Sequence, residues 1–571
     1  MNSDASPKTF PLRENELRPK RRRSAHTTLA SHGEPWVWLM AGSLTLALMM
    51  IAGLLGLIVV RGSSTFWPVP LQLVQTANGR ESLGEVTRRE EAIDATGPKP
   101  IPFTRRLIRI ANFEITGNHF EWIDDRLITS ESNPTWATAV ERLEGGRFHG
   151  FPARLLERGV AVAEGPEAAW EKFNELHPSV RIRWRSAMHL DHTDRGRLQR
   201  TLRNARLAVV QADLDYGNKS PQYFAAIKSE KQILQETEQA ALSLDTQTSE
   251  LREENAKWSF EFSTTSGETT TIPLESIVRA WQPNRIGLMQ KMAVYASRWW
   301  EFLSDNPREA NSAGGVFPAI WGTLAMTMIM ALFVAPFGVL AALYLREYAT
   351  SGPLTTFIRI AINNLAGVPS IVYGAFGLGF FCYFLGSGID AIFFQASLVA
   401  DNQPTFGTGG LLWASLTLAL LTLPVVIVAT EEALSSVPNS MREGSYACGA
   451  GKWQTIRRIV LPRALPGIMT GLILAMARGA GEVAPLMLVG VKKLAVDLPI
   501  DTEFPYIHAS REFMHLSYLV YDVGFQSPNS QAAQPMVFTI TFLLVTLIAL
   551  LNISAIWIRA RLKRRYVSQQ F

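Results

Sequence analysis

Long runs of apolar residues alternate with polar stretches along this chain. The first run, residues 36–60, contains 25 residues with no Asp, Glu, Lys or Arg. About 18 such residues are enough for a helix to cross a hydrocarbon core of about 30 Å. Five comparable runs occur after a long polar block, so the pattern predicts six membrane-spanning helices and excludes an ordinary soluble enzyme. The predicted spans are residues 36–60, 316–345, 366–385, 411–430, 465–491 and 536–558.

The segment ahead of the first run, residues 1–35, is polar and rich in Ser, Thr, Lys and Arg. This composition predicts a disordered, basic cytoplasmic tail. A cleaved signal peptide is the alternative explanation of the run that follows. We favour a retained span, because the run exceeds the usual apolar core of a signal peptide, which has about 7–15 residues.

Lys and Arg are distributed unevenly over the segments between the spans. They recur in residues 346–365, in residues 431–464 and in the C-terminal tail, whereas residues 386–410 contain none. Basic residues favour the cytoplasmic side of short loops. The pattern therefore predicts a multi-pass membrane protein, with both termini cytoplasmic and residues 61–315 outside the cytoplasm.

The overall charge does not change this interpretation. The formal net charge is +5, but the basic residues cluster beside the apolar runs instead of forming one patch. This distribution favours contact with membrane lipid and argues against nucleic-acid binding. The two cysteines, Cys382 and Cys448, lie outside the polar block and provide neither a disulfide framework nor a cysteine-based zinc site.

The polar block, residues 61–315, is long enough to form an extracytoplasmic domain. Alternating stretches such as residues 106–116 predict strands, whereas residues 221–257 predict a long polar helix. We therefore expect a mixed α+β insertion. Its sequence contains no recognisable metal cluster, nucleophile elbow or phosphate loop, and does not indicate a function.

The long polar helix has two possible packing modes. Ile227, Leu234 and Ala241 are spaced by seven residues, which is typical of a coiled-coil seam, but the pattern fades at Thr248. A solvated helix packed on its own domain is the alternative, and we favour it.

Residues 431–464, between the fourth and fifth predicted spans, have a distinctive local pattern. Pro438 suits the first turn of a short helix, and Gly449 and Gly451 suit a turn. A second helix is predicted to end at Pro462, with three apolar side chains on one face. These are Trp453, Ile456 and Val460. We expect a helix-turn-helix knob that a cytosolic partner could grip.

The spacing within this loop resembles the EAA signature of ABC importer permeases. Glu443 is followed by Gly449 six residues later, and then by Ile459 and the pair Leu461 and Pro462. In that family the loop docks into a groove of the ATP-hydrolysing subunit. The resemblance therefore implies an ATPase-coupling role for the same five residues.

The chain departs from the family pattern where the family has two alanines. Gly444 and Ser445 occupy these positions. Both residues are small enough to permit close approach, but a glycine weakens a helix.

Two further segments narrow the resemblance. Residues 365–377 and 477–486 are similar to the A-type permease subunits of phosphate ABC transporters, in a long form with an N-terminal extension. The similarity covers residues 316–566. It implies an α-helical polytopic protein with the type I ABC importer permease fold, whose five helices in this region follow the first span. The implied partners are a second homologous permease subunit, a dimer of ATPase subunits, an extracytoplasmic phosphate-binding protein and inorganic phosphate.

Other functions stay open at this point. A permease for another oxyanion, such as sulfate or molybdate, would share the docking loop. A membrane sensor with an extracytoplasmic domain is a second alternative, but it would leave the EAA-like loop unexplained.

Charged and small residues inside the apolar runs mark a candidate substrate pathway. Arg478 lies in the fifth predicted span, where a central charge costs about 2.5–3.5 kcal/mol, so we expect it to face protein or water. Glu482 is expected one helical turn later on the same face. A guanidinium matches phosphate oxygens bidentately, which favours a pathway role for both residues. An ion pair that only braces the helices is the alternative.

The third predicted span contains a proline that is expected to break or kink the helix. Backbone N–H groups freed at Pro369, near Ser370, could meet an anion. Close helix packing through Ser370 and Gly374 is the interpretation that we favour, with the anion role as the alternative.

Residues 449–453 superficially resemble a phosphate loop. They lack the leading glycine at the required distance and a Ser or Thr after Lys452. We therefore expect a transporter subunit that is not an enzyme and holds no cofactor, with ATP and Mg²⁺ used by the partner ATPase.

Overall fold

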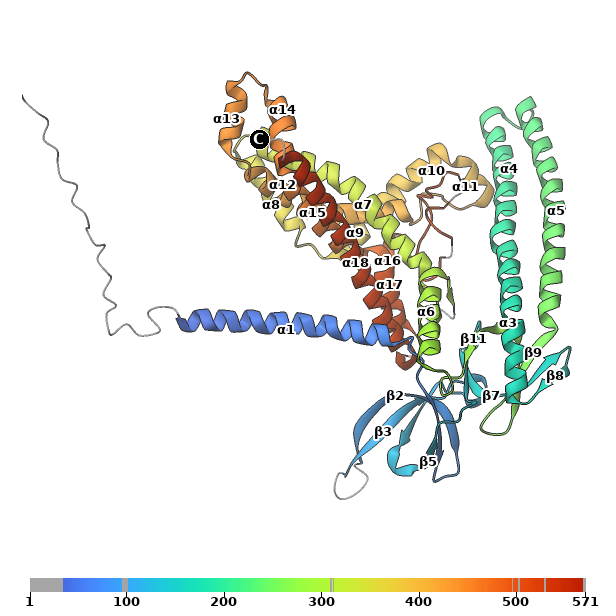
Figure 1. Cartoon of the computed structure of the whole chain (residues 1–571). Helices are drawn as coiled ribbons and strands as arrows, with labels where there is room; N and C mark the ends of the chain where they lie inside the picture. The colour runs from blue at the N-terminus through green and yellow to red at the C-terminus, as the bar shows by residue number, and fades with distance from the viewer. Residues whose placement is uncertain are drawn as a thin grey trace, which may run out of the picture. The chain divides into compact units, whose positions relative to one another are not determined.

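A computed structural model describes residues 34–94, 101–308, 311, 313–495, 497–501, 504–527 and 530–567 (Figure 1). The chain divides into two units, residues 1–59 and residues 60–571. Almost all of the predicted disordered tail, residues 1–35, lies outside the described residues. The first unit contains most of the helix α1 (Glu34–Ser64), whose apolar side chains are exposed all round, as suits a helix surrounded by lipid.

The second unit begins with a mixed α+β domain that contains two antiparallel sheets. The strand order is β4-β3-β2-β1-β5 in the first sheet and β10-β9-β7-β6-β11 in the second, where β8 also pairs with β7. The first sheet comprises β1 (Leu71–Thr76), β2 (Glu81–Asp94), β3 (Ile101–Arg109), β4 (Phe120–Asp124) and β5 (Ile128–Ser132). The second comprises β6 (Thr138–Arg142), β7 (Arg147–Glu157), β8 (Val160–Glu164), β9 (Trp258–Ser263), β10 (Thr269–Pro273) and β11 (Ile277–Trp281).

The strand predicted over residues 106–116 is only partly present. β3 ends at Arg109, and Phe113–Thr116 form the short helix α2. Ala111 and Asn112 have φ angles of 53° and 52°, a left-handed conformation that is incompatible with a strand. An alternating pattern of apolar residues does not reveal this reversal of the backbone.

A long helical hairpin projects from the second sheet. The helix α3 (Pro166–His189) continues through a π-turn, Leu190–Asp194, into α4 (Arg195–Tyr216). The helix α5 (Pro221–Ala256) then returns beside both (Figure 1). The side-chain hydroxyl of Ser220 caps α5 by accepting a hydrogen bond from the N–H of Tyr223.

Both packing modes expected of the long polar helix are present at once: a coiled-coil seam, and packing on its own domain. Buried and half-buried positions of α5 alternate at spacings of three and four from Ile227 to Asn255, so the helix packs on its own domain through a coiled-coil seam. The seam does not fade at Thr248, which is 4% exposed. Buried Asn255 extends it by accepting a hydrogen bond from Arg183 at 2.8 Å. The sequence pattern did not predict this part of the seam, because Thr248 and Asn255 are polar and only apolar positions were considered.

Six helices among the described residues are long and apolar enough to span a membrane, which is the predicted number. They cover Trp36–Ser64, Phe317–Tyr348, Ser370–Phe393, Leu411–Ser435, Lys452–Gly481 and Ala533–Arg561. The fourth, α12 (Leu411–Ser435), is the most buried and packs between α7 (Phe317–Leu343) and α15 (Leu461–Gly481). The remaining spans are built from α1, from α9 (Ser370–Phe376) with α10 (Ser387–Phe393), and from α18 (Ser530–Val567).

Shorter elements connect the spans. They are α6 (Leu288–Ser304), β12 (Pro307–Arg308), β13 (Ala313–Gly314), α8 (Pro353–Leu365), α11 (Gln395–Asp401), α13 (Asn439–Ala447), α14 (Lys452–Thr455), α16 (Ala484–Val489) and α17 (Leu516–Tyr521). π-turns interrupt several helices, at Tyr344–Tyr348, Gly377–Gly386, Ile456–Val460 and Asp522–Gln526.

Of the two outcomes expected at Pro369, a break or a kink, the structure has a break between two helices. The helix α8 ends at Leu365, and Pro369 has the extended backbone of an N-cap directly before α9. A proline is well tolerated at the start of a helix, where its missing N–H would have no partner within the helix. The span therefore begins at Ser370, later than residue 366.

Candidate functional site

The predicted helix-turn-helix knob is present between the fourth and fifth spans. It consists of α13 and α14, joined by Gly449 and Gly451. Gly449 has a φ of 80°, a left-handed conformation that glycine adopts without steric cost. Glu443 and Gly449 are exposed, so two of the predicted coupling residues are available to a partner.

The two departures from the family pattern have different consequences. The hydroxyl groups of Ser445 and Thr455 lie 2.8 Å apart and join α13 to α14. Thr455 is buried, so this hydrogen bond is shielded from water. A side chain at Gly444 would meet open space. Ser445 therefore stabilises the knob, whereas Gly444 only makes its helix less stable.

A buried ion pair fastens the knob to a different span. Arg442 on α13 donates from Nη2 to Glu347 at 2.9 Å, and these side chains are only 12% and 8% exposed. The same guanidinium donates to the carbonyls of Leu434 and Val437 at 2.9 and 2.6 Å. In the sequence Arg442 is one of several basic residues in residues 431–464, and a partner 95 positions away leaves no local signal.

The second helix of the knob does not end at Pro462 as predicted. The helical segment runs from Lys452 to Gly481, and the π-turn Ile456–Val460 precedes the proline. In a regular helix a proline clashes with the carbonyl four residues earlier, but the wider π-turn displaces that carbonyl. The N–H of Leu461 instead donates to the carbonyl of Ile456. The knob and the fifth span therefore form one continuous helix.

The remaining coupling residues are less accessible than the resemblance implies. Ile459, Leu461 and Pro462 are half-buried on this continuous helix. Exposed aromatic side chains lie instead at the tip, where Tyr446 is 43% and Trp453 56% exposed. Trp453, Ile456 and Val460 were predicted to share one face of this helix. Ile456 and Val460 are buried, but Trp453 is exposed, so the prediction is only partly correct.

The fifth span also ends earlier than predicted, which changes the position of Arg478. The helix α15 ends at Gly481, so Arg478 lies in its last turn and not midway along a span. Glu482 has an extended backbone and follows the helix. The apolar run continues to residue 491, and for this reason hydropathy alone did not locate the break. The carboxylate of Glu482 still lies 3.5 Å from Nε of Arg478, as the pairing prediction required.

The broken segment is held in place by close backbone packing. A side-chain atom at Gly374 on α9 would lie 2.7 Å from Cα of Pro485 on α16, so only glycine permits this approach. The hydroxyl of Ser517 donates to the carbonyl of Ala480 at 2.7 Å. Packing through Gly374 thus agrees with the small-residue packing that we favoured for this part of the third span.

Ser370, the third predicted pathway residue, lies one turn before Gly374 at the start of α9 and is half-buried. Within the part of the chain that the structure describes, no hydrogen bond or ion pair joins it to Arg478 or Glu482. The structure thus brings together two of the three predicted pathway residues. No group of three or more His, Cys, Asp or Glu side chains in the described ranges could hold a metal ion.

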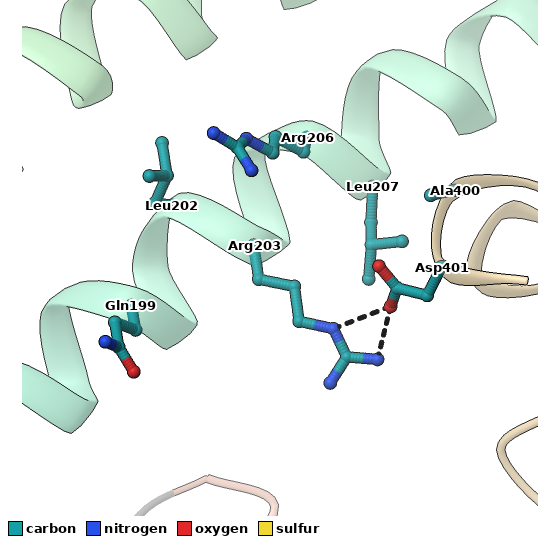
Figure 2. Close-up of a pocket in the computed structure, with 7 residues that line it drawn as sticks. All are labelled: Gln199, Leu202, Arg203, Arg206, Leu207, Ala400 and Asp401. Carbon is teal, nitrogen blue, oxygen red and sulfur yellow. Dashed lines mark hydrogen bonds and ion pairs between the residues drawn. The ribbon is translucent and has the colours of Figure 1, made fainter. Parts of the chain in front are cut away.

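A surface hollow lies between α4 and α11 (Figure 2). Its lining comprises Gln199, Leu202, Arg203, Arg206, Leu207, Ala400 and Asp401. Nε and Nη2 of Arg203 donate to the same oxygen of Asp401 at 2.9 and 2.6 Å. Because this charge is paired, the hollow is a poor anion site. The contact nevertheless joins the α+β domain to residues 395–401.

Sequence comparison assigns the chain to a class of membrane protein. The profile of a family described as "Binding-protein-dependent transport system inner membrane component" matches residues 334–568. The phosphate transport system permease protein PstA of Yersinia pestis is 32% identical over 231 residues, which cover 37% of this chain and 71% of that protein. The chain belongs to this family of ABC importer permeases.

Two other similar proteins are also named as phosphate transport system permeases. The phosphate transport system permease protein PstA 1 of Mycobacterium tuberculosis (strain CDC 1551 / Oshkosh) is 41% identical over 199 residues, or 35% of this chain and 59% of that protein. PstA of Mycobacterium leprae (strain TN) is 40% identical over 202 residues, or 35% of this chain and 60% of that protein. The chain thus spans about three fifths of the length of these relatives.

Proposed function

We propose that this chain is the permease subunit of an ATP-driven importer for inorganic phosphate, which moves the anion across the inner membrane by alternating access. The observation that carries the proposal is the continuous helix from Lys452 to Gly481. One end of it belongs to the knob, and the other presents Arg478 beside Glu482. Phosphate is the favoured cargo because the named relatives are phosphate permeases.

The chemistry of the Arg478 site suits a transient anion site. Its guanidinium is 37% exposed and can offer several N–H donors to phosphate oxygens. Glu482 competes for the same donors, so binding stays reversible. The helix C-terminus carries a partial negative charge that stabilises a cation in the last turn. An arginine in this position can therefore exchange a carboxylate for phosphate.

The knob is the proposed contact with a dimer of ATPase subunits. Glu443 and Gly449 would dock directly, with Tyr446 and Trp453 adding apolar contact area. ATP and Mg²⁺ would be used by those subunits. A second homologous permease would complete the passage, and an extracytoplasmic phosphate-binding protein would deliver the anion.

The proposed topology follows the distribution of basic residues. Both termini are cytoplasmic, and residues 61–315 are periplasmic. The ion pair between Arg203 and Asp401 supports this arrangement, because it links the α+β domain to a loop without Lys or Arg.

Uptake of labelled phosphate by cells that lack this chain tests the proposal. Wild type is expected to restore uptake, whereas Arg478→Ala and Gly449→Asp should insert at normal levels and fail. Arg359→Ala is a matched control, because it removes a guanidinium that lies outside the spans, on α8, and pairs with Glu431 at 3.4 Å. Labelled sulfate and molybdate are measured in parallel. Restoration of either ion without phosphate would overturn the cargo assignment, and restoration of none would favour a sensor.

A further inference from the structure

The helix α6 has an exposed stripe that is apolar throughout. Met289 is 80%, Met292 53% and Trp300 73% exposed, and Leu303 is 37% exposed. With Ala296, which is also exposed, they recur at spacings of three and four and so occupy one face of the helix. Such a row costs free energy in water and indicates that something apolar covers it.

The opposite face of α6 is fixed to the α+β domain by buried charges. Arg298 is 5% exposed, and its Nη2 lies 3.0 Å from Glu141. Its Nη1 donates to the carbonyl of Phe66 at 2.8 Å. Glu301 pairs with Arg279 at 3.0 Å. Rotation of the helix would break these interactions and leave buried charges without partners. For this reason α6 cannot turn its apolar stripe inward.

The end of α6 packs against the ends of three spans. Phe302 belongs to a buried cluster that also contains Phe66, Val316 and Ile540, from segments next to or within α1, α7 and α18. The ring of Trp299 packs edge-on against Phe66 at 5.1 Å and against Phe542 at 6.0 Å. The helix therefore lies where the chain passes from the spans into the α+β domain.

We propose that α6 lies in the membrane interface, with Met289, Met292, Trp300 and Leu303 inserted among lipid acyl chains. Three observations favour lipid over a protein partner. The stripe is one helix face wide, it contains no charged residue, and it adjoins spans whose own surfaces face lipid. A tryptophan at this level is typical of the aromatic belt of membrane proteins. Flexible methionine side chains adapt to a disordered environment.

Insertion of α6 into the membrane would give the α+β domain a second attachment to the bilayer, whatever the transported substrate is. The α+β domain is attached to the membrane by α6 in addition to the spans, and the ion pairs of Arg298 and Glu301 transmit that attachment. The domain is thereby held at the bilayer and cannot swing freely on its connecting segments.

Spin-label accessibility in the full-length chain tests the proposal. In a Cys382→Ala/Cys448→Ser background, nitroxides are attached through Met289→Cys, Met292→Cys and Trp300→Cys. The chain is placed in nanodiscs of phosphatidylethanolamine and phosphatidylglycerol. Val160→Cys on β8 is the matched control, since Val160 is an apolar residue with 69% exposure in the α+β domain.

Collision rates of the spin labels with two reagents show whether lipid, water or protein covers the apolar stripe. Oxygen concentrates in lipid, whereas a nickel chelate stays in water. The ratio of oxygen to nickel accessibility is expected to be several-fold higher at the three α6 positions than at Val160. Nickel accessibility equal to the control would show that water covers the stripe and would overturn the proposal. Labels shielded from both reagents, in the chain alone or when partner subunits are co-purified, would show a protein cover and would overturn it as well.

Discussion

Arg442 on α13 donates a hydrogen bond to Glu347 at the end of the second span, across 2.9 Å and almost out of reach of water. The two residues are 95 positions apart in the chain. The knob is thus fastened to the π-turn that follows α7 by a buried charge pair, in addition to its covalent connections with α12 and α15. A force on the knob therefore acts on three helices at once.

Removal of one partner of this pair should be costly. Arg442→Met would leave the carboxylate of Glu347 buried without a counter-charge, which destabilises a protein by about 3–5 kcal/mol. We expect a lower unfolding temperature of the purified chain and a loss of phosphate uptake.

The double variant Arg442→Met/Glu347→Gln removes both charges and should recover most of the lost stability. Arg359→Met serves as the exposed control, and its loss should be about 0–1 kcal/mol. Equal losses for Arg442→Met and Arg359→Met would contradict a buried, energetically important pair.

The turn of the knob offers a matched pair of glycines. Gly449 has a φ of 80° and Gly444 is helical, but a side chain at either position would meet open space. Gly449→Ala should therefore destabilise the knob through backbone strain alone, by about 1–2 kcal/mol. Gly444→Ala should stabilise it by about 0.5–1 kcal/mol.

Hydrogen exchange of the peptide that covers residues 439–455 measures both effects. We expect faster exchange in Gly449→Ala and slower exchange in Gly444→Ala. The same direction of change in both variants would argue against the left-handed turn.

Contact between the third span and the segment after the break should be sensitive to a single methyl group. Gly374→Ala would bring its new carbon within 2.7 Å of the backbone of Pro485, whereas Gly379→Ala on the same span meets nothing within 4 Å. Such overpacking costs about 1–3 kcal/mol. We expect reduced thermal stability and uptake for Gly374→Ala only, and similar results for the two variants would refute the close approach.

The α+β domain should lose stability under mildly acidic conditions because of His149. Burial lowers the pKa of this imidazole from 6.5 to about 4, with Arg147 and Arg109 acting in the same direction and Glu85 opposing them. The unfolded chain therefore binds a proton below pH 6.5 that the folded domain rejects until about pH 4. Stability falls as pH decreases through this window, by about 2 kcal/mol between pH 7 and pH 5.

Hydrogen exchange of β6 and β7 in the full chain, corrected for intrinsic rates at pH 7 and pH 5, measures this loss. The variant His149→Gln lacks the titrating group and should show a smaller pH dependence, even if it is less stable at pH 7. An unchanged dependence would assign the effect to another group that titrates in the same window, such as His177 on α3, whose pKa is also lowered by burial.

The number of spans and the knob were predictable from the sequence because each depends on local composition. Apolar runs alone predict spans, and the spacing from Glu443 to Pro462 alone indicates the loop. The pairing of Arg478 with Glu482 was also predictable, since four residues separate them. The resemblance to ABC importer permeases was confirmed by the family assignment.

Features that depend on tertiary context were missed. Apolar spacing does not register the buried Thr248 and Asn255 of the α5 seam, because these residues are polar. Hydropathy continues past Gly481, although backbone packing ends the helix there. Pro462 suggested a helix end, since nothing in the local sequence announces the preceding π-turn.

The π-turn before Pro462 lets one helix continue from the knob to the end of the fifth span, so that movement at one end can be passed to the other. A helix of 30 residues is about 45 Å long, and it transmits tilt from one end to the other as far as it stays straight at the π-turn and at Pro466, which also lies inside it. A small displacement of Trp453 at the knob would reappear as a displacement of Arg478 near the opposite end. The proposed anion site at Arg478 would thus respond to movement of an ATPase subunit bound at the knob, without any change in the conformation of the helix that joins them.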